Sequence, residues 1–511
     1  MNNNQLEATW DYHNRTKHSP QSVRSSGHFM DWDNQPLLFK IYSTLQPTPL
    51  PQELSPSSVS ALAALSALPE WKEVSIPDLR TVARILFLSA GITRRRKYPG
   101  GEVFFRAASC TGALYHIDLY LVCGDLPGLD AGVYHFGVQD FSLRKLRSGD
   151  YREILVRASA AEPAVAAAPA VIVCADTFWR NTWKYQARAY RHSFWDSGTI
   201  LANLLAVAAA HRVPARLVMG FVDKEVDRLL DLDGERETAL SLVALGHGGE
   251  SAPPAPEPGP LSLETVPLSA EEVPYPAIPR MHLASSLATP EEVAAWRGKT
   301  PAISLPDPSG TFFPLETGAE GEAPGDSLEQ VILRRGSTRQ FAREPISFKQ
   351  FSRILQSATR GIPADFLDPP GSFLNTLYVI ALAVDGLPKG SYVYHPGREA
   401  LELLNEGDFR REGGFLGLEQ DLPADASVDI FFLADLGPIL ERYGNRGYRA
   451  AELEAGIIGG KLYLAAYAER LGATGLTFYD DEVTDFFSPH AAGKSVMFLM
   501  SLGRSVRRKE K

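Results

Sequence analysis

Cysteine is scarce in this sequence and shows no pairing pattern. Three cysteines, Cys110, Cys123 and Cys174, stand in 511 residues. An odd and sparse count excludes a disulfide framework and is typical of a protein kept in a reducing cytoplasm. None of the three belongs to a CxxC pair or lies beside clustered histidines, so the sequence predicts no metal site.

Long hydrophobic runs are also missing. The most apolar runs, residues 165–175 and 199–210, are too short to cross a hydrocarbon layer of ~30 Å. The first residues, MNNNQLEATWDYHNRTKHS, lack the apolar core of a signal peptide. We therefore expect a cytoplasmic protein without a membrane segment.

Positive charge is in deficit. The formal net charge of -10 argues against a broad surface for nucleic acid or for an anionic membrane. A hydrophobic content of 44% and a charged content of 22% are typical of a soluble globular protein. The length suggests more than one domain. Neither nucleic acid nor a membrane is expected as a partner.

Proline and glycine are concentrated in residues 250–325, which open with ESAPPAPEPGP and close with TGAEGEAPGD. Proline at this density breaks helices and disfavours central strands. The segment is predicted to be a linker with one short helix near residues 290–297. It divides the chain into a first domain, residues 1–249 with an N-terminal extension, and a second domain, residues 326–511.

The two domains resemble each other in sequence. LYLVCGDLPGLDAGVYHF, residues 119–136, is echoed by LYVIALAVDGLPKGSYVYHP, residues 377–396. ARAYRHSFWDSGTILANLLAVAAA, residues 187–210, is echoed by NRGYRAAELEAGIIGGKLYLAAYA, residues 445–468. The offset between matching positions stays close to constant, which favours an ancient duplication. Below, the two domains are called copy one and copy two.

Each copy is predicted to combine helices and strands. An apolar strand, a turn and a second strand precede a long helix, and a final strand closes the copy. The long helices carry glycine and alanine at a spacing of four residues, as around Gly198 and Gly456. Small residues let two helices approach closely, so we expect these helices to join the copies into an internal pseudo-dimer.

Each copy has a basic segment that the other lacks. Copy one carries about ten extra residues around TRRRK, residues 93–97, which is either a solvated loop or a basic rim near an entrance. Copy two carries RRGSTR, residues 334–339, which is either a solvated helix start capped by Ser337 or an anion site. The nearest counterpart in copy one is NRTKHS, residues 14–19.

Three motifs resemble those of one enzyme family. Arg335-x-Ser337-x-Arg339 resembles the flavin-phosphate motif of the nitroreductase superfamily. SCTGALY, residues 109–115, resembles the flavin loop of its SagB-type branch, the thiazoline and oxazoline dehydrogenases, although His116 replaces the usual proline after the tyrosine. Trp183-Lys184-Tyr185 resembles the Lys-Tyr motif of that branch. Without this resemblance, SCTGALY is a tight loop that enters a buried strand.

The resemblance implies an α+β fold. Two tandem nitroreductase-like domains would form an intramolecular pseudo-dimer with flavin mononucleotide (FMN) at their interface. Copy two would bind the phosphate, and copy one would supply the loop at the flavin ring. A second, pseudo-symmetric site would combine residues 14–19 with GSFLNTLY, residues 371–378, and is expected to have decayed. One flavin per chain follows from that asymmetry.

The resemblance also implies roles for single residues. Arginine suits a phosphate because its guanidinium is permanently charged and donates two parallel hydrogen bonds. Arg339 would lie near the flavin N1–C2=O edge, and the backbone at Tyr479 and Asp480 would face N5. Arg507 is a second phosphate candidate, with Arg504 or Arg508 as alternatives. The predicted cofactor-binding residues are Arg106, Ser109, Gly112, Ala113, Tyr115, Arg335, Ser337, Arg339, Tyr479, Asp480 and Arg507.

Lys184 and Tyr185 are the catalytic candidates. Aromatising an azoline ring requires removal of a proton from carbon and transfer of a hydride to flavin N5. A lysine in a desolvated pocket has a lowered pKa and can act as the base, and the tyrosine can relay a proton. Copy two has Arg442-Tyr443 instead, and arginine is a poor base because it stays protonated. The alternative is a surface lysine beside a packed aromatic ring.

Three functions remain open at this point. The first is an FMN-dependent dehydrogenase that oxidises azoline rings in a peptide or natural-product intermediate, with other biosynthetic enzymes as partners. The second is an NAD(P)H-dependent reductase of nitro compounds, quinones or enones on the same fold. The third is a non-catalytic flavin- or peptide-binding subunit of a biosynthetic complex.

Overall fold

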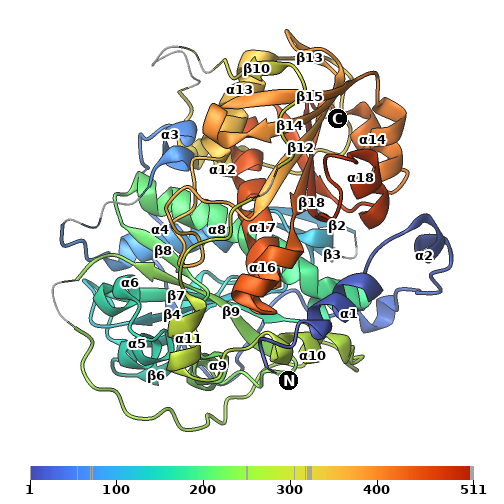
Figure 1. The fold of residues 1–511 in the computed structure, drawn as a ribbon. Coiled ribbons are helices and arrows are strands. Elements are labelled where there is room, and N and C mark those ends of the chain that lie inside the picture. Colours follow the sequence, from blue (N-terminus) through green and yellow to red (C-terminus); the bar gives the residue numbers. More distant parts are fainter. Residues whose placement is uncertain are drawn as a thin grey trace.

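Two seven-stranded sheets, one in each copy, organise the chain in the computed structural model (Figure 1). The structure describes residues 2–53, 56–68, 71, 73–99, 101–248, 251–303, 305–316, 318 and 325–506. The sheet of copy one has the order β1 (Pro47–Pro49), β6 (Ser142–Ser148), β5 (Gly132–Gly137), β4 (Ile117–Cys123), β7 (Ala170–Thr177), β9 (Glu237–Leu245) and β8 (Ala215–Val218). The sheet of copy two has the order β10 (Phe312–Pro314), β15 (Ala400–Glu406), β14 (Gly390–His395), β12 (Asn375–Ala381), β16 (Val428–Ala434), β18 (Ser495–Gly503) and β17 (Gly472–Leu476).

The strand order is the same in both sheets once each strand is matched to its counterpart, as β4 is to β12 and β9 to β18. Neighbouring strands pair antiparallel throughout, as in β4 with β7 and β12 with β16. Central strands such as β4 are buried along their whole length, which explains their unbroken apolar sequences. The predicted duplication and the α+β class are confirmed.

The long helices α8 (Ala189–Ala210) and α17 (Arg446–Ala468) cross between the copies, in the centre of Figure 1. They touch at Gly198 and Gly456, where a Cβ added to Gly198 would lie 2.6 Å from the backbone carbon of Gly456. A larger side chain at either position would force the helices apart. The predicted helix contact that makes the internal pseudo-dimer is therefore confirmed.

Buried ion pairs repeat on both sides of this crossing. At the start of α8, Arg188 and Arg191 bind Asp480, the first residue of α18 (Asp480–Phe486) in copy two, at 2.9 and 2.7 Å. At the start of α17, the matching residues Arg446 and Arg449 bind Asp223, the first residue of α9 (Asp223–Leu230) in copy one, at 2.7 and 2.8 Å. All six side chains are buried. Each copy therefore holds the other by two arginines on one carboxylate.

The proline-rich segment packs against both copies. It contains the expected helix, α11 (Pro290–Trp296), and a second helix that was not predicted, α10 (Ala277–Ala284). Trp296 is buried and donates its indole N–H to the carbonyl oxygen of Tyr443 at 2.9 Å. Apolar residues between the prolines therefore anchor a segment whose composition alone indicates a loose connection.

The remaining elements complete the two layers around the sheets. They are α1 (Glu7–Arg15), α2 (Pro20–Arg24), η1 (Trp32–Asn34), α3 (Ala61–Ser66), α4 (Leu79–Ala90), β2 (Ile92–Tyr98), β3 (Gly101–Arg106), η2 (Thr111–Ala113), α5 (Arg152–Ala158), α6 (Pro163–Ala167), α7 (Trp179–Tyr185), η3 (Gln186–Arg188), α12 (Leu328–Arg334), β11 (Ile346–Ser347), α13 (Phe348–Ala358), β13 (Val384–Asp385), η4 (Pro396–Arg398), α14 (Arg410–Leu416), α15 (Asp421–Asp425) and α16 (Leu436–Tyr443). Within the described ranges, none of the helices has both the length and the apolarity required to cross a membrane.

Candidate functional site

A cleft of about 380 Å³ lies between the two copies. Copy one lines it with His18, Ser109, Cys110, Thr111, Gly112, Lys184, Tyr185, His192, Trp195, Asp196 and Thr199. Copy two lines it with Ser337, Arg339, Gln420, Tyr463, Thr474, Gly475, Leu476, Thr477 and Phe498. The loop, the Lys-Tyr pair, Ser337 and Arg339 are far apart in the sequence but share one cavity.

The loop of residues 109–115 bends sharply at the wall of the cleft. Gly112 adopts a positive φ of 62°, and a Cβ added there would lie 2.9 Å from Oη of Tyr185. Only glycine combines this backbone conformation with the close approach of the tyrosine ring. The glycine therefore lets the loop and the Lys-Tyr pair form one continuous surface.

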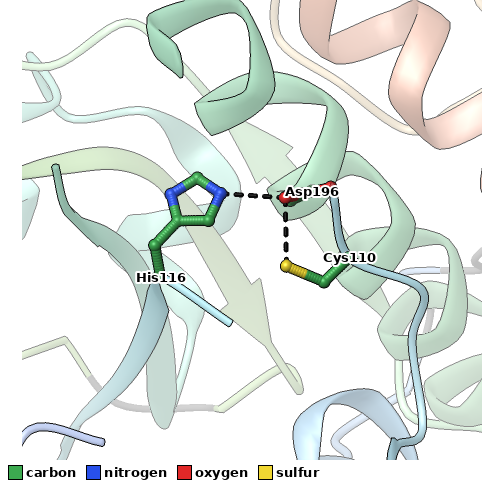
Figure 2. Close-up of side chains that lie close together, drawn as sticks. All are labelled: Cys110, His116 and Asp196. Carbon is green, nitrogen blue, oxygen red and sulfur yellow. Dashed lines mark hydrogen bonds and ion pairs between the residues drawn. The ribbon is translucent and has the colours of Figure 1, made fainter. Parts of the chain in front are cut away.

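Asp196 on α8 anchors this loop. Its carboxylate accepts hydrogen bonds from the backbone N–H and the hydroxyl of Thr111, both at 2.9 Å, and from Sγ of Cys110 at 3.1 Å. Figure 2 shows Cys110 and His116 pointing toward this carboxylate, and Nε2 of His116 lies 2.8 Å from it. The loop is thus fixed to the helix that joins the copies.

His116 links Asp196 to a second carboxylate. Its Nδ1 lies 2.7 Å from Asp176, so the ring donates to one carboxylate from each nitrogen when it is protonated. Burial alone would lower the pKa of His116, but Asp176 and then Asp196 outweigh burial and raise it to about 9. His116 is therefore an imidazolium at neutral pH and part of the loop anchor.

The anchor predicts a pH dependence. Because the pKa of His116 is higher in the folded protein than its ordinary value of 6.5, its contribution to stability is complete below pH 6.5 and is lost as the pH rises toward about 9. We expect the wild-type protein to lose on the order of 3 kcal/mol over that range. In His116→Gln this loss should be absent. Thermal unfolding midpoints of both proteins, measured across the range, would test this, and parallel curves would contradict it.

The sulfur of Cys110 serves this anchor as a hydrogen-bond donor. Ligand atoms of Cys110, His116 and Asp196 lie within 4.8 Å of one another, which is close enough to surround a metal ion. Burial, reinforced by the charge of Asp196, raises the pKa of the Cys110 thiol well above its ordinary value. Metal ligands are thiolates. Without a metal ion, the protonated thiol donates to Asp196 at 3.1 Å.

Lys184 and Tyr185 end helix α7 beside this loop and line the cleft with it. Both are half-buried, and Nζ of Lys184 lies 5.4 Å from the centre of the Tyr185 ring. The ring packs edge-on against His192 with centres 4.6 Å apart. Burial raises the pKa of Tyr185, so the phenol stays protonated and can donate a hydrogen bond. The structure thus places both catalytic candidates in the cavity.

Ser337 and Arg339 form the polar end of the cleft in copy two. Oγ of Ser337 lies 3.1 Å from Oη of Tyr463, which also accepts the backbone N–H of Gly475 at 2.8 Å. Arg339 is exposed at the rim. The helix α12 ends at Arg334 and is capped by Ser327, so the interpretation of RRGSTR as a capped helix start is wrong.

Arg335 does not line the cleft, in contrast to the sequence prediction. Its guanidinium crosses to copy one, where it donates to the carbonyl oxygen of Arg106 at 2.7 Å and to that of Ala107 at 2.9 Å. Arg106, Ala113 and Tyr115 also lie outside the lining. Arg106 packs over the Tyr115 ring at 4.7 Å, behind the loop. These residues pack behind the loop that lines the cleft and do not face the cavity.

The backbone N–H groups of Tyr479 and Asp480 were expected to face the cofactor, but both already have acceptors within the protein. The N–H of Tyr479 donates to Leu416, and that of Asp480 donates to His18. The Asp480 carboxylate is held by the buried arginines of α8. Residues 474–477, at the end of β17, line the cleft in their place.

The predicted contribution of the C-terminal tail is only partly visible. Arg507, like Arg508, lies outside the described residues. The alternative, Arg504, donates to the carbonyl oxygen of Pro345 and lies away from the cleft. The phosphate role of Arg507 stays a prediction.

The pseudo-symmetric position is nearly filled. Leu205, the counterpart of Tyr463, lines a cavity of only about 20 Å³. Glu454, the counterpart of Asp196, accepts the backbone N–H groups of Leu374 and Asn375 at 2.9 and 2.8 Å. The segment of residues 14–19 was expected at this position but contributes His18 to the large cleft. The expected decay of the second site stays a prediction.

Several lining residues were not identified from sequence. Tyr463, Trp195 and Phe498 supply most of the aromatic surface of the cleft. Tyr463 could have been found by comparing the copies, because copy one has Leu205 at the matching position of an otherwise similar helix. From the sequence alone, Trp195 and Phe498 are indistinguishable from core residues. In the structure their rings pack together with centres 5.3 Å apart.

The cleft fits a phosphorylated aromatic cofactor. Its volume lies within the range of ~300–1,000 Å³ that is usual for small-molecule sites. Trp195 and Phe498 offer flat apolar surface, and Ser337 and Tyr463 offer hydroxyl groups at the end where Arg339 supplies a positive charge. An anionic group bound at that end would meet donors and a cation.

A duplicated antiparallel α+β domain with a cleft at the seam defines a two-domain oxidoreductase fold. The family model for the nitroreductase family matches this chain twice, over residues 115–247 and 332–504. The chain belongs to the nitroreductase family and contains two copies of its domain. The family and the fold are those of oxidoreductases that typically bind flavin.

Individual relatives extend this result. The crystal structure of a nitroreductase from Anabaena variabilis is similar over 98% of this chain and 99% of its own, with 26% identity and a TM-score of 0.77. A nitroreductase of Methanocaldococcus jannaschii is 26% identical over 185 residues, 35% of this chain and 91% of that protein. The trifolitoxin-processing protein TfxB of Rhizobium leguminosarum bv. trifolii is 30% identical over 153 residues, 29% of this chain and 41% of TfxB. The matches are consistent with the SagB-type branch.

Proposed function

We propose that the protein is an FMN-dependent dehydrogenase of the SagB type, which oxidises azoline rings in a peptide or natural-product intermediate. One observation carries the proposal: Lys184 of copy one shares a cavity with Ser337 and Arg339 of copy two. Similarity to a protein that processes trifolitoxin supports a substrate from such a pathway.

Residues of both copies would hold FMN. Ser337 and Tyr463 suit the phosphate end, and Arg339 would lie near the N1–C2=O edge of the ring. Gly112 lets the loop backbone approach the ring. Trp195 supplies apolar surface between them. When bound, FMN supplies the acceptor for a hydride.

Lys184 performs the proton transfer in this proposal. Its amine would take the proton from a ring carbon of the azoline, and the second hydrogen would be the hydride for which bound FMN supplies the acceptor. The substrate loses two hydrogens and gains one double bond. Tyr185, which stays protonated, orients the heteroatom of the ring by donating a hydrogen bond.

The relatives described as nitroreductases support a second candidate, an NAD(P)H-dependent reductase that uses the same cleft. The two functions differ in the direction of electron flow. Rapid bleaching of the flavin by NADPH alone, followed by stopped-flow absorbance, would favour the reductase.

The purified protein is expected to be yellow, with an absorbance maximum near ~450 nm and one flavin per chain. The single flavin follows from the sequence asymmetry, since only copy two carries RRGSTR and only copy one carries the Lys-Tyr pair. Incubation with a synthetic thiazoline or oxazoline peptide should lower the mass of the peptide by two hydrogens. Two flavins per chain would contradict the single site, and an unchanged mass with reduction by NADPH would contradict the dehydrogenase.

A further inference from the structure

An exposed basic hairpin lies beside the cleft in copy one. Among the described residues, the strands β2 and β3 pair only with each other and belong to neither large sheet (both are labelled in Figure 1). In β2, Arg94, Arg95, Arg96 and Lys97 follow one another, and all four are exposed. Within the described residues, no ion pair joins any of them to an acid. This is an unusual local excess of positive charge on a chain with a net charge of -10.

The hairpin is held in place by aromatic rings beneath the arginines. Arg94 lies over Phe105 at 4.5 Å, and Arg95 lies over Phe104 at 5.5 Å. Phe104 packs edge-on against Phe39, with ring centres 5.3 Å apart. In both contacts the guanidinium carbon itself lies over the ring, and Arg95 also donates to the carbonyl oxygen of Gln139 at 3.2 Å. The positive charges are thus presented on a stiff support.

The base of the hairpin forms part of the cleft wall. The chain runs from Arg106, the last residue of β3, directly to Ser109 and Cys110 in the lining. Arg335 of copy two clasps the carbonyl oxygen of Arg106. Burial chiefly lowers the pKa of Arg335, and the charge of Arg94 lowers it further. The hairpin thus leads directly into the loop that lines the cleft.

We propose that the β2–β3 hairpin docks an acidic, extended segment of a peptide substrate and directs that substrate into the cleft. The inference rests on the proposed function and names its substrate class. Each strand of the two-stranded sheet has one unpaired edge, to which an extended peptide can add as a further strand. Carboxylates on such a peptide would meet the run of cations in β2.

The shape of the patch favours a peptide over a nucleic acid or a membrane. Side chains alternate along a strand, so Arg94 and Arg96 lie on one face of the hairpin and Arg95 and Lys97 on the other. Four residues span only about 13 Å of strand. A duplex or a vesicle surface would contact one face of this narrow ribbon and would meet a chain that is negative elsewhere. A strand added at the edge reaches the cations on both faces.

Neutralising the hairpin would test the proposal on the flavin-loaded protein. Arg94→Gln, Arg96→Gln and Lys97→Gln are combined in one variant. A matched control combines Arg80→Gln, Lys224→Gln and Arg280→Gln, which remove the same charge at exposed positions elsewhere. Fluorescence anisotropy then measures binding of a short fluorescein-labelled peptide with four glutamates and of its counterpart with four glutamines.

The wild-type protein and the control should bind the glutamate peptide more tightly than the glutamine peptide. The hairpin variant should bind it roughly tenfold more weakly, with unchanged flavin content. Equal affinity for both peptides, or equal binding by the hairpin variant, would overturn the proposal, as would tighter binding of a short DNA duplex or of anionic vesicles. Turnover of a small azoline, measured in parallel, keeps the two proposals separate, because its failure counts against the dehydrogenase and not against docking.

Discussion

Lys184→Ala should leave the protein yellow and stop its turnover. The lysine lines the cleft but lies at the end of α7, away from Ser337 and Tyr463, so flavin content should not change. Loss of a positioned general base typically lowers a rate by about 10²–10⁴-fold. Single-turnover reduction of the bound flavin by an azoline peptide measures this step directly.

The variant Lys184→Arg tests whether Lys184 is needed as a base or only as a positive charge. Arginine keeps the positive charge but stays protonated, so this variant should be as slow as Lys184→Ala. Added ethylamine should partly restore the alanine variant, because it returns a base to the space that the side chain leaves. Full activity of either variant would remove Lys184 from the mechanism.

The duplication and the contact between the two copies could be predicted from the sequence, because many matching positions in the two copies keep a constant spacing. Matching positions such as Gly198 and Gly456 keep their spacing, and in the structure they touch. The absence of a Lys184 counterpart in copy two, where Arg442 stands, indicated which copy holds the catalytic pair. In the structure Arg442 donates to the backbone of the proline-rich segment, at Arg297 and Lys299.

Predictions for single cofactor contacts were less successful because they depend on distant partners. The N–H of Asp480 lies at a helix start, where backbone donors are often free, but His18 accepts it from a position 462 residues earlier. Arg335 meets backbone carbonyls at the base of a hairpin that belongs to copy one. These partners lie hundreds of residues away in the sequence. The motif spacing therefore located the segments near the cleft but did not predict the direction in which the Asp480 N–H and the Arg335 side chain point.

The anchor formed by Asp196 shows a similar limit. Asp196 and His192 lie four residues apart on α8, but His192 faces Asn181 at 2.8 Å and Asp196 faces the loop. A carboxylate amid small residues of a buried helix requires several donors, and here it has four. An acidic residue on the apolar helix α8 could therefore have predicted that Asp196 binds several hydrogen-bond donors.

Asp480→Asn is expected to destabilise the joined copies strongly. The carboxylate is buried between Arg188 and Arg191, and its removal leaves two buried guanidinium groups without their counter-charge. Breaking a buried pair by removing one partner typically costs about 3–5 kcal/mol. Urea unfolding followed by circular dichroism should show this loss, and Asp223→Asn should match it because Arg446 and Arg449 repeat the arrangement.

The neighbouring residue provides the control for this prediction. Asp481 pairs with Lys17 at 2.7 Å but keeps 68% of its side chain exposed, so Asp481→Asn should cost at most about 1 kcal/mol. Burial raises the pKa of Asp480, but the two arginines outweigh burial and lower it to about 2. The stabilisation is therefore complete above the ordinary pKa of an aspartate, about 3.9, and is lost as the pH falls toward 2. Equal unfolding midpoints for Asp480→Asn and Asp481→Asn would show that the buried arginines do not join the copies through this carboxylate.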